Sequence, residues 1–209
     1  MDIKKFEKKT RYARWQRKRK RKLIKEAKKG KSGQIVLLGD SITELFNVKL
    51  LDGCSELEIY NSGLSGDTTN RMIERLEETV LCLKPSQLVL LVGTNDFSKG
   101  ADVEYVFENI KRIVEIIRGD NPSVAVTLEC VYPVDSSKKG LESGRNEKIE
   151  KLNSMLKIYA EGEGLGLLDL TESLKSENGA FSSQNSDDGL HPNENGFAIV
   201  AEGLKSVLK

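Results

Sequence analysis

The sequence is poor in several residue types, and each shortage limits what the chain can be. It has one histidine, three cysteines and four prolines in 209 residues. Cys54, Cys82 and Cys130 are odd in number and widely spaced, and there is no second histidine to complete a zinc set. We therefore expect reduced thiols, no metal site and a cytoplasmic location.

Long apolar runs are also missing. No stretch approaches the roughly 18 consecutive apolar residues of a membrane-spanning helix. The basic N-terminal stretch is not followed by the apolar core of a signal peptide. These two absences argue against secretion and against a membrane-spanning protein.

Charge is divided unevenly along the chain. Residues 1–33 carry sixteen Lys and Arg against three acidic residues, whereas residues 34–209 carry seventeen against twenty-nine. The net charges are therefore about +13 and about −12. We divide the chain into a basic N-terminal helical appendage, residues 1–33, and one globular domain, residues 34–209. With 38% apolar residues overall, a domain of this length can bury a sizeable core.

Short apolar runs alternate with longer amphipathic segments in the domain. Strands are predicted at 34–39, 57–60, 87–93, 124–130 and 165–170, and helices at 70–83, 103–117, 149–160 and after Pro192 through Val207. Strands that alternate with helices pair in parallel through right-handed crossovers. The predicted fold class is therefore α/β, a three-layer α/β/α sandwich with a five-stranded parallel sheet.

Polar clusters at the ends of the predicted strands contain the groups that acyl transfer needs, and ligands of parallel sheets bind at this edge. Ser41 is the candidate nucleophile, His191 the base, and Asp188 the carboxylate that orients the histidine. The backbone amides of Ser41 and Gly66 and the side chain of Asn95 are candidate donors to an oxyanion.

Three other aspartates lie beside these candidates. Asp187 is adjacent to Asp188 and is an alternative partner for His191, because the sequence does not fix the direction of the loop. Asp40 and Asp67 are expected to hold their loops through hydrogen bonds and to take no part in the chemistry.

Four blocks of sequence carry a resemblance to a known family: GDSIT at 39–43, SGDTT at 65–69, GTND at 93–96 and DGLHPN at 188–193. In this order they resemble the SGNH hydrolases, or GDSL-type esterases and lipases, over residues 34–209. The resemblance implies a flavodoxin-like fold, acylhydrolase activity without a cofactor, and the roles given above for Ser41, Gly66, Asn95, Asp188 and His191. The GxSxG elbow of ordinary α/β-hydrolases is absent.

The resemblance is strongest to the small acetylhydrolase branch related to platelet-activating-factor acetylhydrolase. It implies a small-molecule ester substrate, such as an acetylated carbohydrate or a lysophospholipid. Because the chain has no large insertion to act as a lid, we expect an open, shallow acyl pocket that favours acetyl to butyryl esters.

Each block taken alone is typical of a turn and helix cap. The alternative function is therefore a catalytically idle glycan- or lipid-binding module with a polyanion-binding basic arm.

The appendage allows more than one interpretation. Residues 11–22 combine Tyr12 and Trp15 with a dense basic run, a pattern compatible with nucleic acid or an anionic membrane. We favour instead a helix that lays Phe6, Trp15, Leu23 and Ile24 against the acidic domain. Packing of this helix against a partner protomer in a homo-oligomer is an equal alternative.

Overall fold

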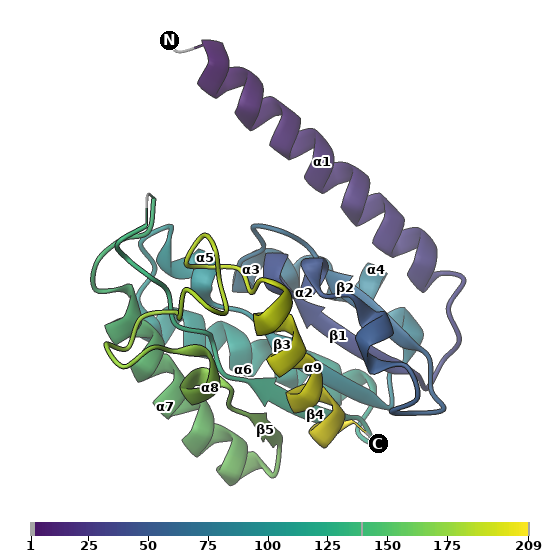
Figure 1. Ribbon diagram of the computed structural model, residues 1–209. Helices are drawn as coiled ribbons and strands as arrows, with labels where there is room; N and C mark the ends of the chain where they lie inside the picture. Colours follow the sequence, from purple (N-terminus) through teal and green to yellow (C-terminus); the bar gives the residue numbers. More distant parts are fainter. Residues whose placement is uncertain (1–2, 139, 209) are drawn as a thin grey trace.

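The protein is a parallel α/β sandwich with a long N-terminal helix beside it (Figure 1). The computed structural model describes residues 3–138 and 140–208, and the side chains within this part from residue 10 onward. The five strands are β1 Ile35–Gly39, β2 Ile59–Gly63, β3 Gln87–Leu91, β4 Ala125–Glu129 and β5 Gly166–Leu168. All neighbouring strands pair in parallel, in the order β2-β1-β3-β4-β5. The predicted fold class is confirmed.

Helices and short 3-10 turns connect the strands. They are α1 Ile3–Ala27, α2 Ser41–Leu45, η1 Val48–Leu51, α3 Thr69–Ile73, α4 Leu76–Thr79, η2 Leu81–Leu83, α5 Thr94–Phe97, α6 Val103–Asp120, α7 Arg145–Glu163, α8 Thr171–Leu174 and α9 Glu194–Val207. Across the described residues, no helix has both the length and the apolar character that crossing a membrane requires.

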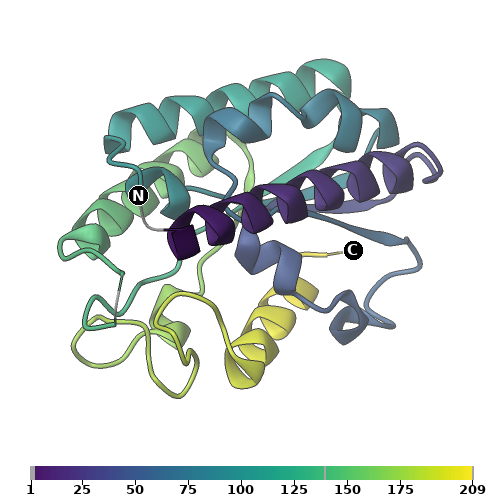
Figure 2. The same cartoon turned by 90° about the horizontal axis from the view of Figure 1, so that it is seen from above.

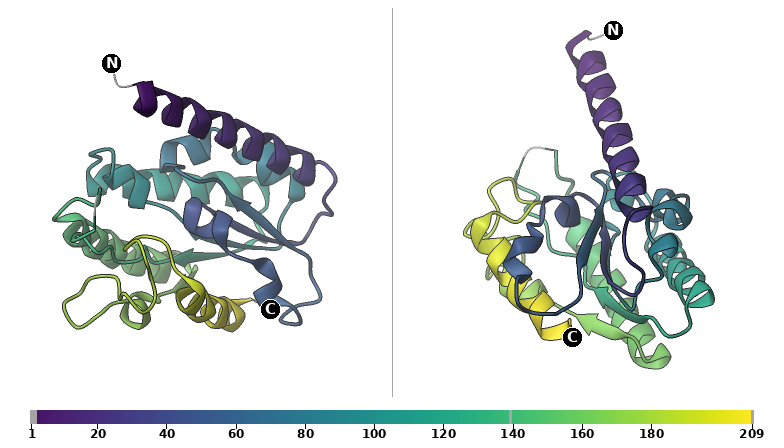
Figure 3. Two further views of the ribbon diagram at one scale, coloured as in Figure 1. Left: turned by 45° about the horizontal axis from the view of Figure 1, so that its top comes forward. Right: turned by 90° about the vertical axis from the view of Figure 1, so that its right-hand side faces the viewer.

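Each face of the sheet has its own apolar core, because side chains along a strand alternate between the two faces. Val36 and Leu38 of β1 pack with α6 and α7, whereas Ile35 and Leu37 pack with α9. The central strands are buried on both sides, which explains their nearly continuous apolar sequences. The right-hand view of Figure 3 shows the sheet between its two helical layers.

The helix predicted over residues 70–83 is wrong as a single element. The segment is divided into α3, α4 and η2, and the division between α3 and α4 falls at Glu74 and Arg75. Met72, Leu76, Val80 and Leu83 are all buried, so the apolar pattern is met without one continuous helix. Arg75 is also buried, and its guanidinium contacts the ends of β1 and β2.

Helix α1 passes over the domain on the side where the strands end. Seen from above, it crosses the middle of the molecule (Figure 2). Leu23 and Ala27 are buried and Ile24 is half-buried, whereas Trp15 remains 41% exposed. The expected packing of Leu23 and Ile24 therefore occurs, but Trp15 has a different environment. The side chain of Phe6 lies outside the described part.

Candidate active site

Ser41 lies at the first turn after the central strand. Strand β1 ends at Gly39, and Asp40 caps α2 by accepting the Ile42 N–H at 3.0 Å. A side chain at Gly39 would bring its Cβ to 1.9 Å from Thr43 Oγ1, so this tight turn requires glycine. The Ser41 side chain is thereby presented at the carboxyl edge of the sheet, where parallel α/β folds bind ligands.

His191 and Asp188 complete a hydrogen-bonded chain with Ser41. His191 Nε2 lies 2.9 Å from Ser41 Oγ, and His191 Nδ1 lies 2.7 Å from Asp188 Oδ2. Asp188 Oδ1 also accepts the backbone N–H groups of Leu190 and His191. Partial burial alone would raise the pKa of Asp188, but these hydrogen bonds outweigh burial and hold its pKa below the ordinary value.

Asp187 does not contact the histidine in this arrangement. Its carboxylate accepts a hydrogen bond from Asn193 Nδ2 at 3.2 Å. Asn193 is the N-cap of α9 and also accepts the Gly196 N–H. Asp187 therefore contacts the start of this helix, and Asp188 is the carboxylate at the site.

Gly66 and Asn95 face the same cleft as Ser41 and His191. Gly66 has a φ of +72°, which a glycine adopts without strain. Asn95 Nδ2 donates to Asp40 Oδ2 at 3.0 Å, so one hydrogen of the amide fixes its orientation. Burial raises the pKa of Asp40 to about 7. The second hydrogen of Asn95 is available to a ligand in the cleft.

Hydrogen bonds between the loops fix the positions of these site residues relative to one another. Asp96 accepts the backbone N–H and the hydroxyl of Thr69, which joins the third sequence block to the second. Glu44, one turn after Ser41, accepts the backbone N–H and the hydroxyl of Ser65. The sequence does not reveal these roles, because both carboxylates fit an ordinary position in the first turn of a helix.

A buried ion pair lies beneath the loop of Gly66. Arg75 and Asp67 are each 1% exposed at their side chains, and Arg75 Nε donates to Asp67 Oδ2 at 2.6 Å. The other guanidinium nitrogens donate to Ser62, to Thr79 and to the Gly39 carbonyl. Asp67 thus has the structural role expected from the sequence, but its partner was not predicted.

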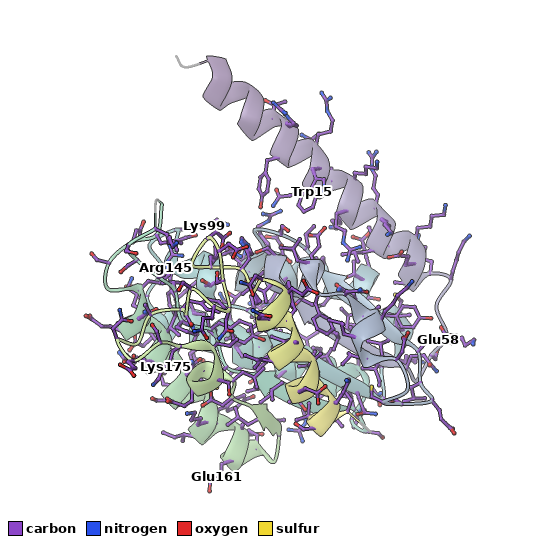
Figure 4. The ribbon with its side chains drawn as sticks, in the orientation of Figure 1. Trp15, Glu58, Lys99, Arg145, Glu161 and Lys175 are labelled. Carbon is purple, nitrogen blue, oxygen red and sulfur yellow. The ribbon has the colours of Figure 1, made fainter. Side chains whose placement is uncertain are left out.

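The cleft above Ser41 has a volume of about 910 Å³. Its lining includes Arg11, Tyr12 and Trp15 of α1 together with Leu45, Ser65 and Leu190. The N-terminal helix, and not an insertion in the domain, therefore forms one wall of the cleft. Figure 4 shows Trp15 on the side of α1 that faces the domain.

The fold and the Ser-His-Asp geometry are those of a hydrolase with a serine at the carboxyl edge of a parallel sheet. The sequence model of the GDSL-like lipase/acylhydrolase family matches residues 37–199. The chain therefore belongs to this family of enzymes that hydrolyse esters.

Curated relatives and solved structures agree with this assignment. The platelet-activating factor acetylhydrolase IB subunit alpha2 of Rattus norvegicus is 28% identical over 184 residues, which cover 86% of this chain and 78% of the relative. The alpha1 subunit of Bos taurus is also 28% identical, over 86% of this chain and 77% of the relative.

Among solved structures, a GDSL-like lipase from Bacteroides thetaiotaomicron is 26% identical with a TM-score of 0.72, over 83% of this chain and 86% of that one. A Streptococcus pneumoniae structure, whose name refers to platelet activating factor, is 24% identical with a TM-score of 0.82. That match covers 94% of this chain and 96% of the other, so it includes part of α1.

Proposed function

We propose that the protein is a serine esterase that cleaves short-chain, acetyl-like carboxylic esters through an acyl-enzyme on Ser41. The observation that carries the proposal is the 2.9 Å separation of His191 Nε2 from Ser41 Oγ, with Asp188 on the other ring nitrogen. His191 takes the hydroxyl proton as Ser41 Oγ attacks the carbonyl carbon, and then gives this proton to the leaving alcohol. Water, deprotonated by His191, then attacks the acyl carbon. The bond from this carbon to Ser41 Oγ breaks, His191 returns the proton to Ser41 Oγ, and the acid is released.

The oxyanion of the tetrahedral intermediate needs donors that are fixed before the reaction. The backbone N–H groups of Ser41 and Gly66 and the side-chain amide of Asn95 are the proposed donors. Their common position on the cleft and the hydrogen bond from Asn95 to Asp40 support this assignment. Because Asp40 holds the amide in place, little reorientation is required when the negative charge forms.

The acyl group is proposed to be short, from acetyl to butyryl. The names of the curated relatives, which are acetylhydrolase subunits, support this preference. The cleft is much larger than an acetyl group and falls within the size range of sites for drug-sized ligands, so most of it is available to the rest of the ester. p-Nitrophenyl acetate is therefore expected to be hydrolysed faster than the octanoate, and equal rates would disprove the preference.

The first test compares wild type with Ser41→Ala on p-nitrophenyl acetate, with Ser137→Ala as the matched control at an exposed serine. Ser41→Ala should lose turnover by a factor on the order of 10⁴ or more, whereas Ser137→Ala should retain it. Intact mass after treatment with a fluorophosphonate should show one adduct that maps to Ser41. Folded wild-type protein with neither turnover nor adduct would favour the idle binding module.

A further inference from the structure

Helix α1 lies outside the region that matches the family but forms part of the cleft. The match begins at residue 37, and α1 ends at Ala27. Arg11, Tyr12 and Trp15 nevertheless line the same cleft as Ser41 and His191. A segment that is separate from the catalytic domain in sequence therefore contributes directly to the surface that an ester contacts.

The helix is fixed to the loop that carries Gly66. Gln16 Nε2 donates to the Ser65 carbonyl at 2.7 Å, and Arg19 Nε donates to the Gly63 carbonyl at 3.1 Å. Arg19 also lies 3.4 Å from the Glu44 carboxylate, which binds the Ser65 amide. Together with the burial of Leu23, these contacts place the middle of α1 at a defined position over the cleft.

Two aromatic side chains project from this fixed part of the helix. The rings of Tyr12 and Trp15 are stacked, with centroids 6.0 Å apart and an interplanar angle of 26°. They are 45% and 41% exposed. A Cβ built on Gly66 would lie 2.2 Å from the Tyr12 hydroxyl, so Tyr12 reaches one of the proposed oxyanion donors.

The aromatic pair and two leucines make an apolar surface beside a polar catalytic group. Leu45, 56% exposed, and Leu190 belong to the same lining. Large apolar side chains that stay exposed around a concave site are typical of ligand-binding surfaces. Neither ring is buried in the core, so packing of the fold does not account for their placement.

We propose that α1 is a specificity element of the active site, in which Tyr12 and Trp15 bind an apolar group of the ester beyond the reacting carbonyl. This inference rests on the proposed esterase activity. The ligand chemistry is an aromatic or extended alkyl group on the alcohol side of the ester, because the proposed acyl group is short. The expected result is a preference for esters with such a group over small aliphatic esters.

The kinetic test uses full-length Tyr12→Ala, Trp15→Ala and the double variant. Tyr105→Ala is the control, since this tyrosine is 50% exposed on α6 and does not line the cleft. Acid release is measured with ethyl acetate, 2-naphthyl acetate and ethyl octanoate. Each cleft variant should lower kcat/KM for 2-naphthyl acetate, relative to ethyl acetate, by about tenfold, mainly through KM.

The two bulky esters locate the apolar group. A selective loss on 2-naphthyl acetate supports the proposal, whereas a selective loss on ethyl octanoate would place the aromatic pair against the acyl chain and contradict it. An equal loss on all three esters, or no loss, would overturn the proposal. Unchanged melting temperatures should show that the variants fold, because both rings are exposed.

A binding measurement separates this inference from the esterase proposal. Trp15 is the single tryptophan of the chain, so its fluorescence reports on the cleft wall directly. Ser41→Ala protein, which cannot form the acyl-enzyme, is titrated with ethyl octanoate, 2-naphthyl acetate and ethyl acetate. We expect a saturable change in Trp15 emission with 2-naphthyl acetate at concentrations about tenfold below those needed for ethyl acetate. No such difference would reject the specificity element, whatever the activity of the wild type.

Discussion

The two sides of the cleft differ in how their residues are held. On the catalytic side, Ser41 is 8% exposed, and His191 and Asn95 are oriented by carboxylates. On the side of α1, the aromatic rings are more than two-fifths exposed and stack mainly on each other. Chemistry requires fixed geometry, whereas an apolar contact tolerates a range of ligand positions. We infer that the fixed side determines the reaction and that the α1 side adjusts which esters are accepted.

The same comparison applies to charge. Residues 1–33 are strongly basic and the domain is acidic, yet two ion pairs described between α1 and the domain join Arg19 to Glu44 and Lys20 to Glu78. Many other basic side chains of α1 are exposed, including Arg14, Arg17, Lys18, Arg21 and Lys22. Opposite net charge thus contributes a general attraction, but hydrogen bonds to backbone carbonyls and the burial of Leu23 determine where the helix lies.

The largest effect on stability is expected from Arg75→Ala, which removes the cation beneath the catalytic side. Asp67 would remain buried without its partner, and the hydrogen bonds to the ends of β1 and β2 would be lost. We expect a loss of about 3–5 kcal/mol in the free energy of unfolding, measured by urea denaturation. Arg71→Ala, at a partly exposed neighbour, is the matched control and should cost much less. Equal losses would show that the burial of Arg75 has no special importance.

The next largest effect is expected on catalysis from Asn95→Ala. If the amide donates to the oxyanion, kcat on p-nitrophenyl acetate should fall by about a hundredfold to a thousandfold, with little change in KM. The melting temperature should be recorded as well, because the substitution also removes the hydrogen bond to Asp40. Normal kcat in a folded variant would exclude Asn95 from the oxyanion hole. Catalysis would then depend less on fixed side chains than we propose.

Much of the fold could be predicted because the strands are short apolar runs that end in polar clusters. The central strands β1 and β3 fall at the predicted positions within two residues. The break between α3 and α4 could not be predicted, because Met72, Leu76 and Val80 also fit the spacing of a continuous helix. Arginine side chains are usually exposed, so the sequence alone predicts Arg75 at the surface. Only the hydrogen-bond partners that the fold brings to Arg75 explain its burial.

The candidate site was predictable to the extent that it follows from strand ends and sequence blocks. Ser41, Asp188 and His191 lie in such blocks, and the structure brings them within hydrogen-bonding distance. The position of α1 over the cleft could not be predicted from the sequence. Gln16 and Arg19 bind backbone carbonyls, and because every residue has a carbonyl, the sequence gives no signal for these contacts. From the sequence we favour packing of Trp15 against the domain over contact with lipid or nucleic acid, but no feature of the sequence indicates that Tyr12 and Trp15 form a cleft wall.

The smallest effect is expected from Glu129→Gln, which tests the pH dependence of the catalytic side. Glu129 is buried under α2 and accepts a hydrogen bond from Tyr132. Burial raises the pKa of Glu129 from its ordinary 4.5 to about 7. Because the unfolded chain releases this proton at lower pH than the folded protein, the contribution of Glu129 to stability should fall as pH rises from about 4.5 to about 7.

Glu129→Gln keeps a neutral acceptor for Tyr132 and removes this titration. The wild type should therefore lose more stability between pH 5 and pH 8 than the variant, by an amount on the order of 1–3 kcal/mol. Urea denaturation at the two pH values measures the difference. The stability of the variant should still depend on pH to some extent, since burial also raises the pKa of Asp40 to about 7.

Identical pH dependence in the two proteins would mean that Glu129 ionises in the folded state as readily as in the unfolded chain. The catalytic side would then hold a buried charge at neutral pH that its hydrogen bonds stabilise.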